Sequence, residues 1–466
     1  MFVGRQRELA TLESCYGKGT FQMIALYGRR RVGKTTLLNE FAKGKRTLFF
    51  TAQEQSDKDN LADFSRQIGS FFDLPGATSF PTWDEALDYL ADKAAEDPFL
   101  LIFDEFPYAA LANPSLPSKL QIAIDHRFLQ TGLCLVLCGS NQGFMESDVL
   151  GKKSPLHGRR TAQIKLEPFG YEDAAQMLGN PEPEDAFKYY ACVGGVPYYL
   201  SLVDTDLTFA ENMRALYFDS DGYLYGEPAM LLRQELREPA LYGSILRAIA
   251  HGANRQSQIA DRTGIPAGTL PRYLGTLREL GIIERVVPFG EDPETSRRGI
   301  YRLRDACYAF WYRFVALAVP DIESGAGELA AQEVTEAQLS EYLGHRFEGV
   351  CLEWLRNEAL AGQLPVAATS VGSWWGTDPV RHEQTDIDVI AADRRDRTAI
   401  IGECKYRNSL DETRTVEALL DKRRLLAGYD VRRVALFSKN PAAQATREKY
   451  ADEAMFISLE DLYGGE

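Results

Sequence analysis

The fold of the first part of this chain is decided by one eight-residue stretch, Gly28-Arg29-Arg30-Arg31-Val32-Gly33-Lys34-Thr35. It has the spacing G-x-x-x-x-G-K-T and follows the apolar run 23–27, which predicts a buried strand. In this motif backbone N–H groups point at phosphates, the lysine reaches the β- and γ-phosphates, and the hydroxyl binds Mg²⁺ at a helix N-terminus. We therefore expect these residues and Thr36 to hold ATP with Mg²⁺, and Lys34 to act in catalysis.

A second motif lies at the end of another apolar run. Residues 99–103 are followed by the acidic pair Asp104 and Glu105, with Asp104 seventy positions after Lys34. The carboxyl end of a buried parallel strand is where ligands bind in such sheets. We expect Asp104 to hold the Mg²⁺ through water and Glu105 to polarise the attacking water.

The first 200 residues alternate apolar runs with helical patterns such as 35–43 and 83–95. The expected strands are 23–27, 47–51, 100–103, 133–138 and 163–166. This alternation predicts an α/β fold with a parallel sheet, and we place this ATPase core at residues 1–170.

Polar residues beyond the core motifs have two interpretations each. Ser140 and Asn141 follow the run 133–138, where they either reach the γ-phosphate and its water or cap a helix. Arg159 and Arg160 either supply transition-state charge, in cis or in trans, or form a salt bridge within the domain.

Length and composition limit the remaining possibilities. A chain of 466 residues should hold about three domains, because single cores rarely exceed about 250–300 residues. The net charge of −15 argues against a surface coated for nonspecific nucleic-acid binding. Seven scattered cysteines, no signal-peptide pattern and no membrane-length apolar stretch favour a cytoplasmic protein with reduced thiols and no membrane partner.

Motifs spread over nearly the whole chain resemble those of one family. They are Phe2-Val3-Gly4-Arg5-Gln6-Arg7-Glu8, the loop 28–35, Asp104-Glu105-Phe106-Pro107-Tyr108, Gly139-Ser140-Asn141, Leu156-His157-Gly158-Arg159-Arg160 and Gly194-Gly195-Val196-Pro197-Tyr198-Tyr199. The chain resembles the archaeal and bacterial P-loop ATPases of the STAND or AAA-like group, in which a winged helix and a DUF234-type domain follow the ATPase.

The resemblance implies further nucleotide contacts. In that family the Gly-Arg-x-x-Glu opening lies near the adenine, which gives this role to Gly4 and Arg5. The Gly-Gly-x-Pro turn, here with Pro197, marks a small helical lid, which we place at residues 171–238. Asn141 and Arg159 with Arg160 are included among the expected nucleotide contacts. His157 stands where the family more often has tyrosine, and Asn141 where it often has serine.

Residues 241–313 differ in charge from the rest of the chain. They contain eleven arginines against seven acidic residues, a local net charge of +4. The runs 256–265 and 270–283 have the pattern of a helix–turn–helix, and 282–288 with 299–303 would be wing strands. We expect a winged helix at 239–315 that contacts DNA phosphates through four arginines, Arg272, Arg278, Arg297 and Arg298.

Interdomain packing is the alternative for this winged helix. Glu291, Asp292 and Glu294 lie beside the wing and weaken the case for DNA binding.

The C-terminal part carries a third set of charged residues. After a predicted linker near 324–333 and a predicted helix 341–359, Asp388 lies on one strand pattern and Glu403 with Lys405 on the next, fifteen positions beyond Asp388. This resembles the PD-(D/E)XK nuclease core, which implies that Asp388 and Glu403 bind Mg²⁺, Lys405 activates water and Glu348 assists. The predicted domain is an α/β restriction-endonuclease-like fold at 334–466.

Alternatives remain for this third site as well. In the alternative interpretation, the two strands form an antiparallel pair whose charged faces are solvated, with a cross-strand Lys–Glu contact. Trp374 and Trp375 either stack on a base or pack in the core.

Three functions fit these patterns. The main one is an ATP-hydrolysing switch coupled to DNA binding and to metal-dependent DNA cleavage by the C-terminal domain. The alternative is a STAND-type signalling or scaffold ATPase, with nucleotide-dependent homo-oligomers, whose winged helix and C-terminal domain only bind DNA or a partner. The third is an ATP-fuelled translocase, which would require hydrolysis strongly stimulated by DNA.

Overall fold

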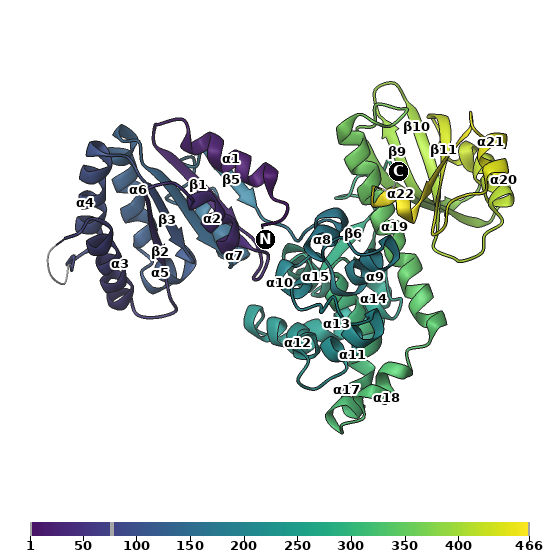
Figure 1. The fold of residues 1–466 in the computed structure, drawn as a ribbon, viewed down its shortest axis with the longest axis horizontal. Coiled ribbons are helices and arrows are strands. Elements are labelled where there is room, and N and C mark those ends of the chain that lie inside the picture. Colours follow the sequence, from purple (N-terminus) through teal and green to yellow (C-terminus); the bar gives the residue numbers. More distant parts are fainter. Residues whose placement is uncertain (1, 75–78, 465–466) are drawn as a thin grey trace. The chain divides into compact units, whose positions relative to one another are not determined.

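The computed structural model describes residues 2–74 and 79–464. Two units divide the chain: Met1–Phe169 with Val196–Tyr198, and Gly170–Gly195 with Tyr199–Glu466. Figure 1 shows the first unit in purple to blue and the second in teal to yellow.

The first unit is built on a five-stranded sheet of order β2-β3-β4-β1-β5, in which every neighbouring pair is parallel. The strands are β1 (Gln22–Tyr27), β2 (Thr47–Thr51), β3 (Leu100–Asp104), β4 (Cys134–Gly139) and β5 (Ala162–Lys165). Every residue of β1, β3 and β4 is buried, which explains their continuous apolar sequences. The predicted parallel α/β fold is confirmed, and each strand lies within about two residues of its expected place.

Alternate residues of each strand enter two separate cores. On one face Met23, Ala25 and Tyr27 pack with α3 (Asp57–Phe71), α4 (Trp83–Glu96), α5 (Phe106–Ala112) and α6 (Leu116–His126). On the other face Ile24 and Leu26 pack with α1 (Gln6–Tyr16) and α2 (Lys34–Ala42). The short α7 (Gln142–Phe144) and a π-helical turn, Met145–Val149, follow β4. The result is the three-layer arrangement visible in Figure 1.

The second unit begins with helices. They are α8 (Tyr171–Met177), α9 (Pro183–Val193), α10 (Pro197–Leu200), α11 (Phe209–Tyr217), α12 (Tyr223–Glu235) and, after the winged helix, α16 (Ala306–Phe310), a π-helical turn Trp311–Val315, α17 (Ala316–Glu323) and α18 (Gly327–Gln332). The presence of α18 corrects the predicted linker at 324–333. Gly327 packs so closely on the Phe218 carbonyl that a side chain there would collide with it, so this stretch is part of the packed unit.

The helix–turn–helix and wing form as the sequence predicts. The elements are α13 (Pro239–Ala250), α14 (Gln256–Thr263), α15 (Leu270–Glu279) and the antiparallel pair β6 (Ile283–Val286) and β7 (Ile300–Leu303). Gly264, with a φ of 70°, ends α14 in the left-handed conformation that glycine tolerates. Pro271 lies in the first turn of α15, where its missing N–H costs no helical hydrogen bond.

The C-terminal part is a mixed α/β domain. The long α19 (Glu336–Ala361) precedes a sheet of order β12-β11-β10-β9-β8. The strands are β8 (Ser370–Thr377), β9 (Gln384–Asp393), β10 (Thr398–Lys405), β11 (Asp430–Ser438) and β12 (Ala454–Ser458), with α20 (Glu412–Lys422), a 3-10 turn Arg423–Leu425, α21 (Gln444–Lys449) and α22 (Leu459–Leu462). Strands β8, β9 and β10 pair antiparallel, whereas β10, β11 and β12 pair parallel.

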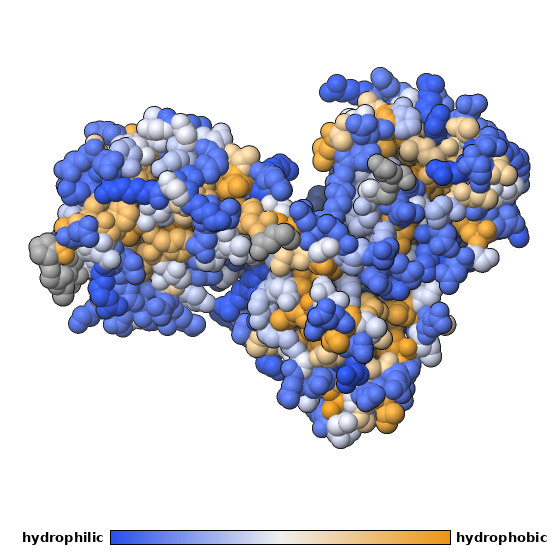
Figure 2. Space-filling model, in the orientation of Figure 1, coloured by the Kyte–Doolittle hydropathy of each residue, from blue (hydrophilic) through white to orange (hydrophobic). Residues whose placement is uncertain are grey.

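The face of the protein in Figure 2 is largely hydrophilic, with separate apolar patches. Large apolar side chains that are exposed include Leu317, Leu329 and Leu360. Among the described residues, no helix has both the length and the apolar sequence needed to cross a bilayer.

Candidate functional site

The loop between β1 and α2 has the conformation its sequence predicts. A side chain at Gly28 would overlap the Leu166 carbonyl oxygen, and Gly33 has a φ of 90°, so both positions require glycine. Lys34 is buried, and its Nζ donates to the carbonyl oxygens of Gly28 (2.9 Å) and Arg29 (3.0 Å). Burial lowers the pKa of Lys34. The ammonium group thus lies inside the loop whose N–H groups would surround phosphates.

The predicted Mg²⁺ ligands of the first unit meet each other. Thr35 Oγ1 donates to Asp104 Oδ2 at 3.2 Å, and Asp104 Oδ1 accepts from the N–H of Glu105 at 3.0 Å. Asp104 is buried, while Thr35 is exposed at the start of α2. A hydroxyl and a carboxylate are oxygen ligands of the kind Mg²⁺ prefers, so the residues present fit this ion.

Glu105 has a specific partner at the end of β4. Its Oε2 accepts from Ser140 through both the backbone N–H (3.1 Å) and Oγ (2.9 Å). Glu105 also has a φ of 50°, which is uncommon for a residue other than glycine. Asn141 instead caps α7, with its Oδ1 accepting from the N–H of Phe144 at 3.0 Å. Of the two polar residues that the sequence indicates here, Ser140 therefore contacts the acidic motif and Asn141 caps a helix.

Arg5 and Pro197 lie beside the same loop. Arg5 Nη2 donates to the carbonyl oxygens of Val32 (3.1 Å) and Glu167 (2.6 Å), and its guanidinium lies 4.6 Å from the Phe169 ring centroid. Gly4 and Arg5 both have positive φ, at 62° and 67°. A Cβ on Gly33 would lie 3.8 Å from Pro197 Cγ, so the Val196–Tyr198 turn adjoins the phosphate loop.

Other arginines of the first unit are held by the protein itself. Arg159 forms a two-pronged salt bridge with Asp125 of α6, at 2.7 and 2.6 Å. Hydrogen bonding from Arg159 lowers the pKa of Asp125. Arg160 Nη1 donates to the Leu150 carbonyl at 3.2 Å, and Arg30 Nη2 to the Tyr108 hydroxyl at 2.9 Å. Arg159 therefore forms the salt bridge within the domain that was the alternative to a nucleotide contact.

The C-terminal strands bring three of the predicted charged residues together. Val389 pairs with Gly402 across β9 and β10, so Asp388 and Glu403 are the next residues on the two strands. Asp388 Oδ2 accepts from the N–H of Cys404 at 2.8 Å. Burial and the nearby carboxylates of Glu403 and Glu348 raise the pKa of Asp388 to about 7.

Glu403 is bound by two lysines, one of which the sequence analysis did not single out. Its Oε1 accepts from Lys405 Nζ at 2.5 Å and its Oε2 from Lys422 Nζ at 2.8 Å. Although burial opposes ionisation, Lys422 and Lys405 lower the pKa of Glu403. Lys422 is the last residue of α20, and it also lies 3.8 Å from Asp386. The basic residue at the end of this helix is visible in the sequence. Only the fold shows that its ammonium group binds the Glu403 carboxylate.

The fourth predicted residue, Glu348, has other partners. It lies on α19, with its carboxylate 3.5 Å from Arg302 Nη1 of β7 and 3.7 Å from His345 Nδ1. Within residues 2–74 and 79–464, no three acidic, histidine or cysteine side chains are grouped so that they could hold a metal ion. Because both oxygens of Glu403 already bind ammonium groups, the residues of this site in the described conformation do not fit a divalent cation.

The arginines predicted to contact DNA differ in their surroundings. Arg272 and Arg278 on α15 and Arg297 in the wing are exposed. Arg298 instead bridges Glu291 Oε1, at 2.7 Å, and the carbonyl oxygen of Trp375. Trp374 packs against the core of the C-terminal sheet, as its core-packing alternative predicts.

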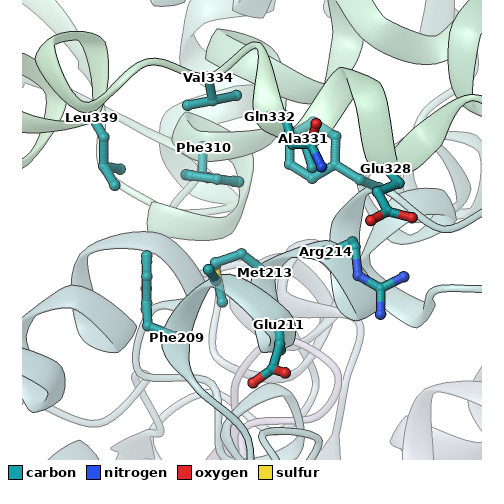
Figure 3. Close-up of a pocket in the computed structure, with 12 residues that line it drawn as sticks. Phe209, Glu211, Met213, Arg214, Phe310, Glu328, Ala331, Gln332, Val334 and Leu339 are labelled. Atoms are coloured by element: carbon teal, nitrogen blue, oxygen red, sulfur yellow. The ribbon is translucent and has the colours of Figure 1, made fainter.

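One pocket in the helical part of the second unit contains none of the predicted site residues. Its volume is about 320 Å³, and Figure 3 shows apolar side chains of α11 and the start of α19 around it, including Phe209, Met213 and Leu339. Glu211, Arg214 and Glu328 lie at its border.

Comparison with known families finds matches to three regions of the chain. Residues 2–203 match a family described as an ATPase domain predominantly from Archaea, residues 243–286 match the IclR helix–turn–helix domain, and residues 311–416 match a family of archaeal and bacterial proteins of unknown function. The expected helix–turn–helix is thereby confirmed.

The relatives and solved structures to which the chain is similar include the following three proteins. An uncharacterised protein of Methanocaldococcus jannaschii is 30% identical over 431 residues, which is 92% of this chain and 93% of the relative. An uncharacterised ATP-binding protein of the same organism is 48% identical over 46 residues, which is 10% of this chain and 78% of that protein. A Walker-type ATPase of Pyrococcus abyssi has a TM-score of 0.51 at 22% identity, covering 67% of this chain and 96% of that one, which shows likeness of fold.

Proposed function

Because the chain belongs to the family of archaeal and bacterial P-loop ATPases that carry a helix–turn–helix and a C-terminal domain of unknown function, we propose that it is an ATP-hydrolysing switch whose nucleotide state controls a DNA-directed C-terminal domain. One observation carries the proposal. Lys34, the Thr35–Asp104 pair and the Glu105–Ser140 pair converge at the C-terminal end of the parallel sheet.

The residues of this site have distinct roles in hydrolysis. Lys34 exchanges its two loop carbonyls for phosphate oxygens when ATP binds. Thr35 and Asp104 would hold Mg²⁺, which would neutralise charge on the phosphates. Glu105 orients the attacking water and accepts its proton, and Ser140 determines where the Glu105 carboxylate rests.

The remaining predicted nucleotide contacts surround this centre. The loop residues 28–33 and Thr36 offer N–H donors and positive charge to the phosphates. Arg5 supports the loop through the Val32 carbonyl, and Pro197 adjoins Gly33, which supports a role for this turn in nucleotide binding. Asn141, Arg159 and Arg160 contact nucleotide only if they leave their present partners.

The second half of the proposal concerns DNA. The local charge of +4 at residues 241–313, in a chain of net charge −15, supports a DNA contact confined to the winged helix. Arg272, Arg278 and Arg297 are exposed and able to bind phosphates. Nuclease action by Asp388, Glu403, Lys405 and Glu348 is the finer part of the proposal, and it requires a state in which both lysines have released Glu403.

A second candidate function is favoured by that pair of lysines. A carboxylate already neutralised by two ammonium groups suits a domain that binds a partner without cutting it, which is the signalling or scaffold ATPase. Slow hydrolysis together with ATP-dependent oligomers would favour this function, whereas hydrolysis strongly stimulated by DNA would favour a translocase.

The deciding experiment measures cleavage of supercoiled and linear DNA with Mg²⁺ or Mn²⁺, with and without ATP. It compares the unmodified protein with Lys405→Ala, and uses Lys449→Ala, an exposed lysine of the same domain, as the matched control. Cleavage that Lys405→Ala alone removes, with ATP hydrolysis intact, supports the nuclease. No cleavage in any condition assigns the C-terminal domain to the scaffold function, and cleavage by Lys405→Ala refutes the nuclease site.

A further inference from the structure

The wing, defined here as residues 287–299, lies on the C-terminal domain. The N–H of Phe289 donates to the carbonyl oxygen of Ser373 in β8 at 2.7 Å. The Phe289 ring packs against the core of the C-terminal sheet and lies 5.9 Å from the Tyr429 ring, edge to face. One backbone hydrogen bond and one partly buried aromatic ring therefore anchor the wing to the edge strand.

Arg298 makes the second anchor. Its guanidinium donates to the carbonyl oxygen of Trp375, two residues along β8 from Ser373, and to Glu291 of the wing itself. In this position Nη1 and Nη2 of Arg298 each bind a protein oxygen, so a two-pronged contact of these nitrogens with a DNA phosphate competes with docking. Within the wing, the Glu291 carboxylate thus compensates the charge of Arg298.

Strand β8 has glycine at both places where the wing sits. A Cβ on Gly372 would come within 3.3 Å of the Phe289 ring, and a Cβ on Gly376 would come within 2.9 Å of Arg298 Nη2. A side chain at Gly372 would press on the Phe289 ring, and a side chain at Gly376 would displace the end of the Arg298 side chain. The edge of the sheet is therefore shaped to receive the wing, which also covers backbone groups that an edge strand otherwise exposes.

The docked wing is close to the charged residues of the C-terminal domain. Trp375 pairs with Asp386 of β9, and Asp386 lies 3.8 Å from Lys422, which binds Glu403. The base of the wing is tied to the same domain, because Arg346 of α19 donates to the carbonyl oxygens of Leu303 (3.1 Å) and Arg304 (3.2 Å). Only β9 separates β8 from β10, the strand that carries Glu403. When the wing leaves β8, it exposes this edge strand, while Arg346 still holds the base of the wing.

We propose that the wing is a latch: docking on β8 competes with binding of duplex DNA, because Arg298 holds the docked wing and is also one of the predicted phosphate contacts. DNA binding to the winged helix then frees the edge of the C-terminal sheet next to Asp386 and Lys422. This inference rests on the proposed DNA-binding function, and it adds the route by which DNA binding reaches the C-terminal domain.

The test uses the full chain with a short duplex DNA as the probe. Hydrogen exchange of β8 amides is measured with and without DNA, and DNA affinity is measured by fluorescence anisotropy. Phe289→Ala releases the latch without removing a cation, so we expect faster β8 exchange in the absence of DNA and roughly threefold to tenfold tighter DNA binding. In the unmodified chain, DNA alone should accelerate β8 exchange.

Two further variants keep the test decisive if Phe289→Ala does not fold. Gly376→Ala alters β8 and leaves every wing residue intact, so it should reproduce both effects of Phe289→Ala. Arg297→Ala is the matched control, because Arg297 is exposed in the wing: it should weaken DNA binding and leave β8 exchange unchanged.

The outcomes separate the latch from the function on which it rests. DNA binding that leaves β8 exchange unchanged, or latch variants that bind DNA no more tightly, overturn the latch alone. No DNA binding by any of these proteins overturns the DNA-binding function and the competition together.

Discussion

Two acidic strand ends of this molecule look alike in sequence and differ in their surroundings. At the end of β3, Asp104 accepts from a threonine hydroxyl and Glu105 from a serine hydroxyl and its N–H. At the end of β10, Glu403 accepts from two lysine ammonium groups. Neutral donors leave the carboxylate charge available to a cation, whereas ammonium groups already compensate it. An acidic motif therefore predicts a metal site only when the charge of its neighbours is known.

The largest expected effect comes from removing the cation of the first region. Lys34→Ala should abolish ATP binding and lower hydrolysis by at least about 100-fold, because no other group in the loop replaces the ammonium at the β- and γ-phosphates. Nucleotide binding is measured by fluorescence with a labelled ATP, and hydrolysis by phosphate release. Lys43→Ala, an exposed lysine nine residues along the chain, is the matched control and should behave like the unmodified protein. Normal ATP binding by Lys34→Ala would contradict the site.

Glu105→Gln should separate binding from chemistry in the same region. The amide retains a hydrogen bond from Ser140 but cannot accept the proton of the attacking water, so turnover should fall about 100-fold or more with ATP affinity retained. Single-turnover hydrolysis and equilibrium ATP binding measure the two quantities. Ser140→Ala should have a smaller effect on turnover, because it moves the carboxylate without removing it. Undiminished hydrolysis by Glu105→Gln would exclude Glu105 as the base.

Lys422→Ala tests the second region directly. Removing one ammonium group from Glu403 should strengthen Mn²⁺ binding by the C-terminal domain, by roughly tenfold if the lysine and the ion compete for the carboxylate. Calorimetry in an Asp104→Asn background, which removes the carboxylate ligand of the first site, measures this affinity. Lys449→Ala is the matched control. Weaker Mn²⁺ binding in Lys422→Ala would mean that the lysine supports a metal site, and the contrast between the two strand ends would fail.

The smallest expected effect concerns pH. Glu353 of α19 is half-buried against α8 and α9, where it accepts from the N–H of Tyr171 (3.3 Å) and the hydroxyl of Tyr190 (3.1 Å). Burial raises the pKa of Glu353. At pH values between the ordinary pKa of glutamate and this raised pKa, the folded state therefore binds more protons than the unfolded state. Stability of the second unit should therefore fall as pH rises from about 4.5 through the raised pKa.

Glu353→Gln removes this ionisation and should flatten that dependence. Urea unfolding of the second unit at pH 5 and pH 8 measures it. Glu336→Gln, an exposed glutamate at the start of the same helix, should leave the slope unchanged. If Glu353→Gln and the unmodified protein lose equal stability between pH 5 and pH 8, other groups produce the pH dependence.

Much of the fold follows from local sequence. The five strands of the first unit are short apolar runs with polar boundaries, and burial on both faces makes such runs recognisable. The stretch 324–333 was missed, because its small and polar residues have a linker-like composition, while its helix depends on Gly327 meeting the Phe218 carbonyl far away in the chain.

By itself, the sequence determined the phosphate loop, the acidic pair Asp104 and Glu105 at the end of an apolar strand, and the helix–turn–helix, because each is specified by residue types in a short local pattern. Only the tertiary structure decided which groups those residues meet: Ser140 at Glu105, Asp125 at Arg159, Lys422 at Glu403 and the Trp375 carbonyl at Arg298. These partners lie 19 to 77 positions apart in the chain. Spacing along a chain carries no information on such pairs, since packing of the sheets and helices brings them together.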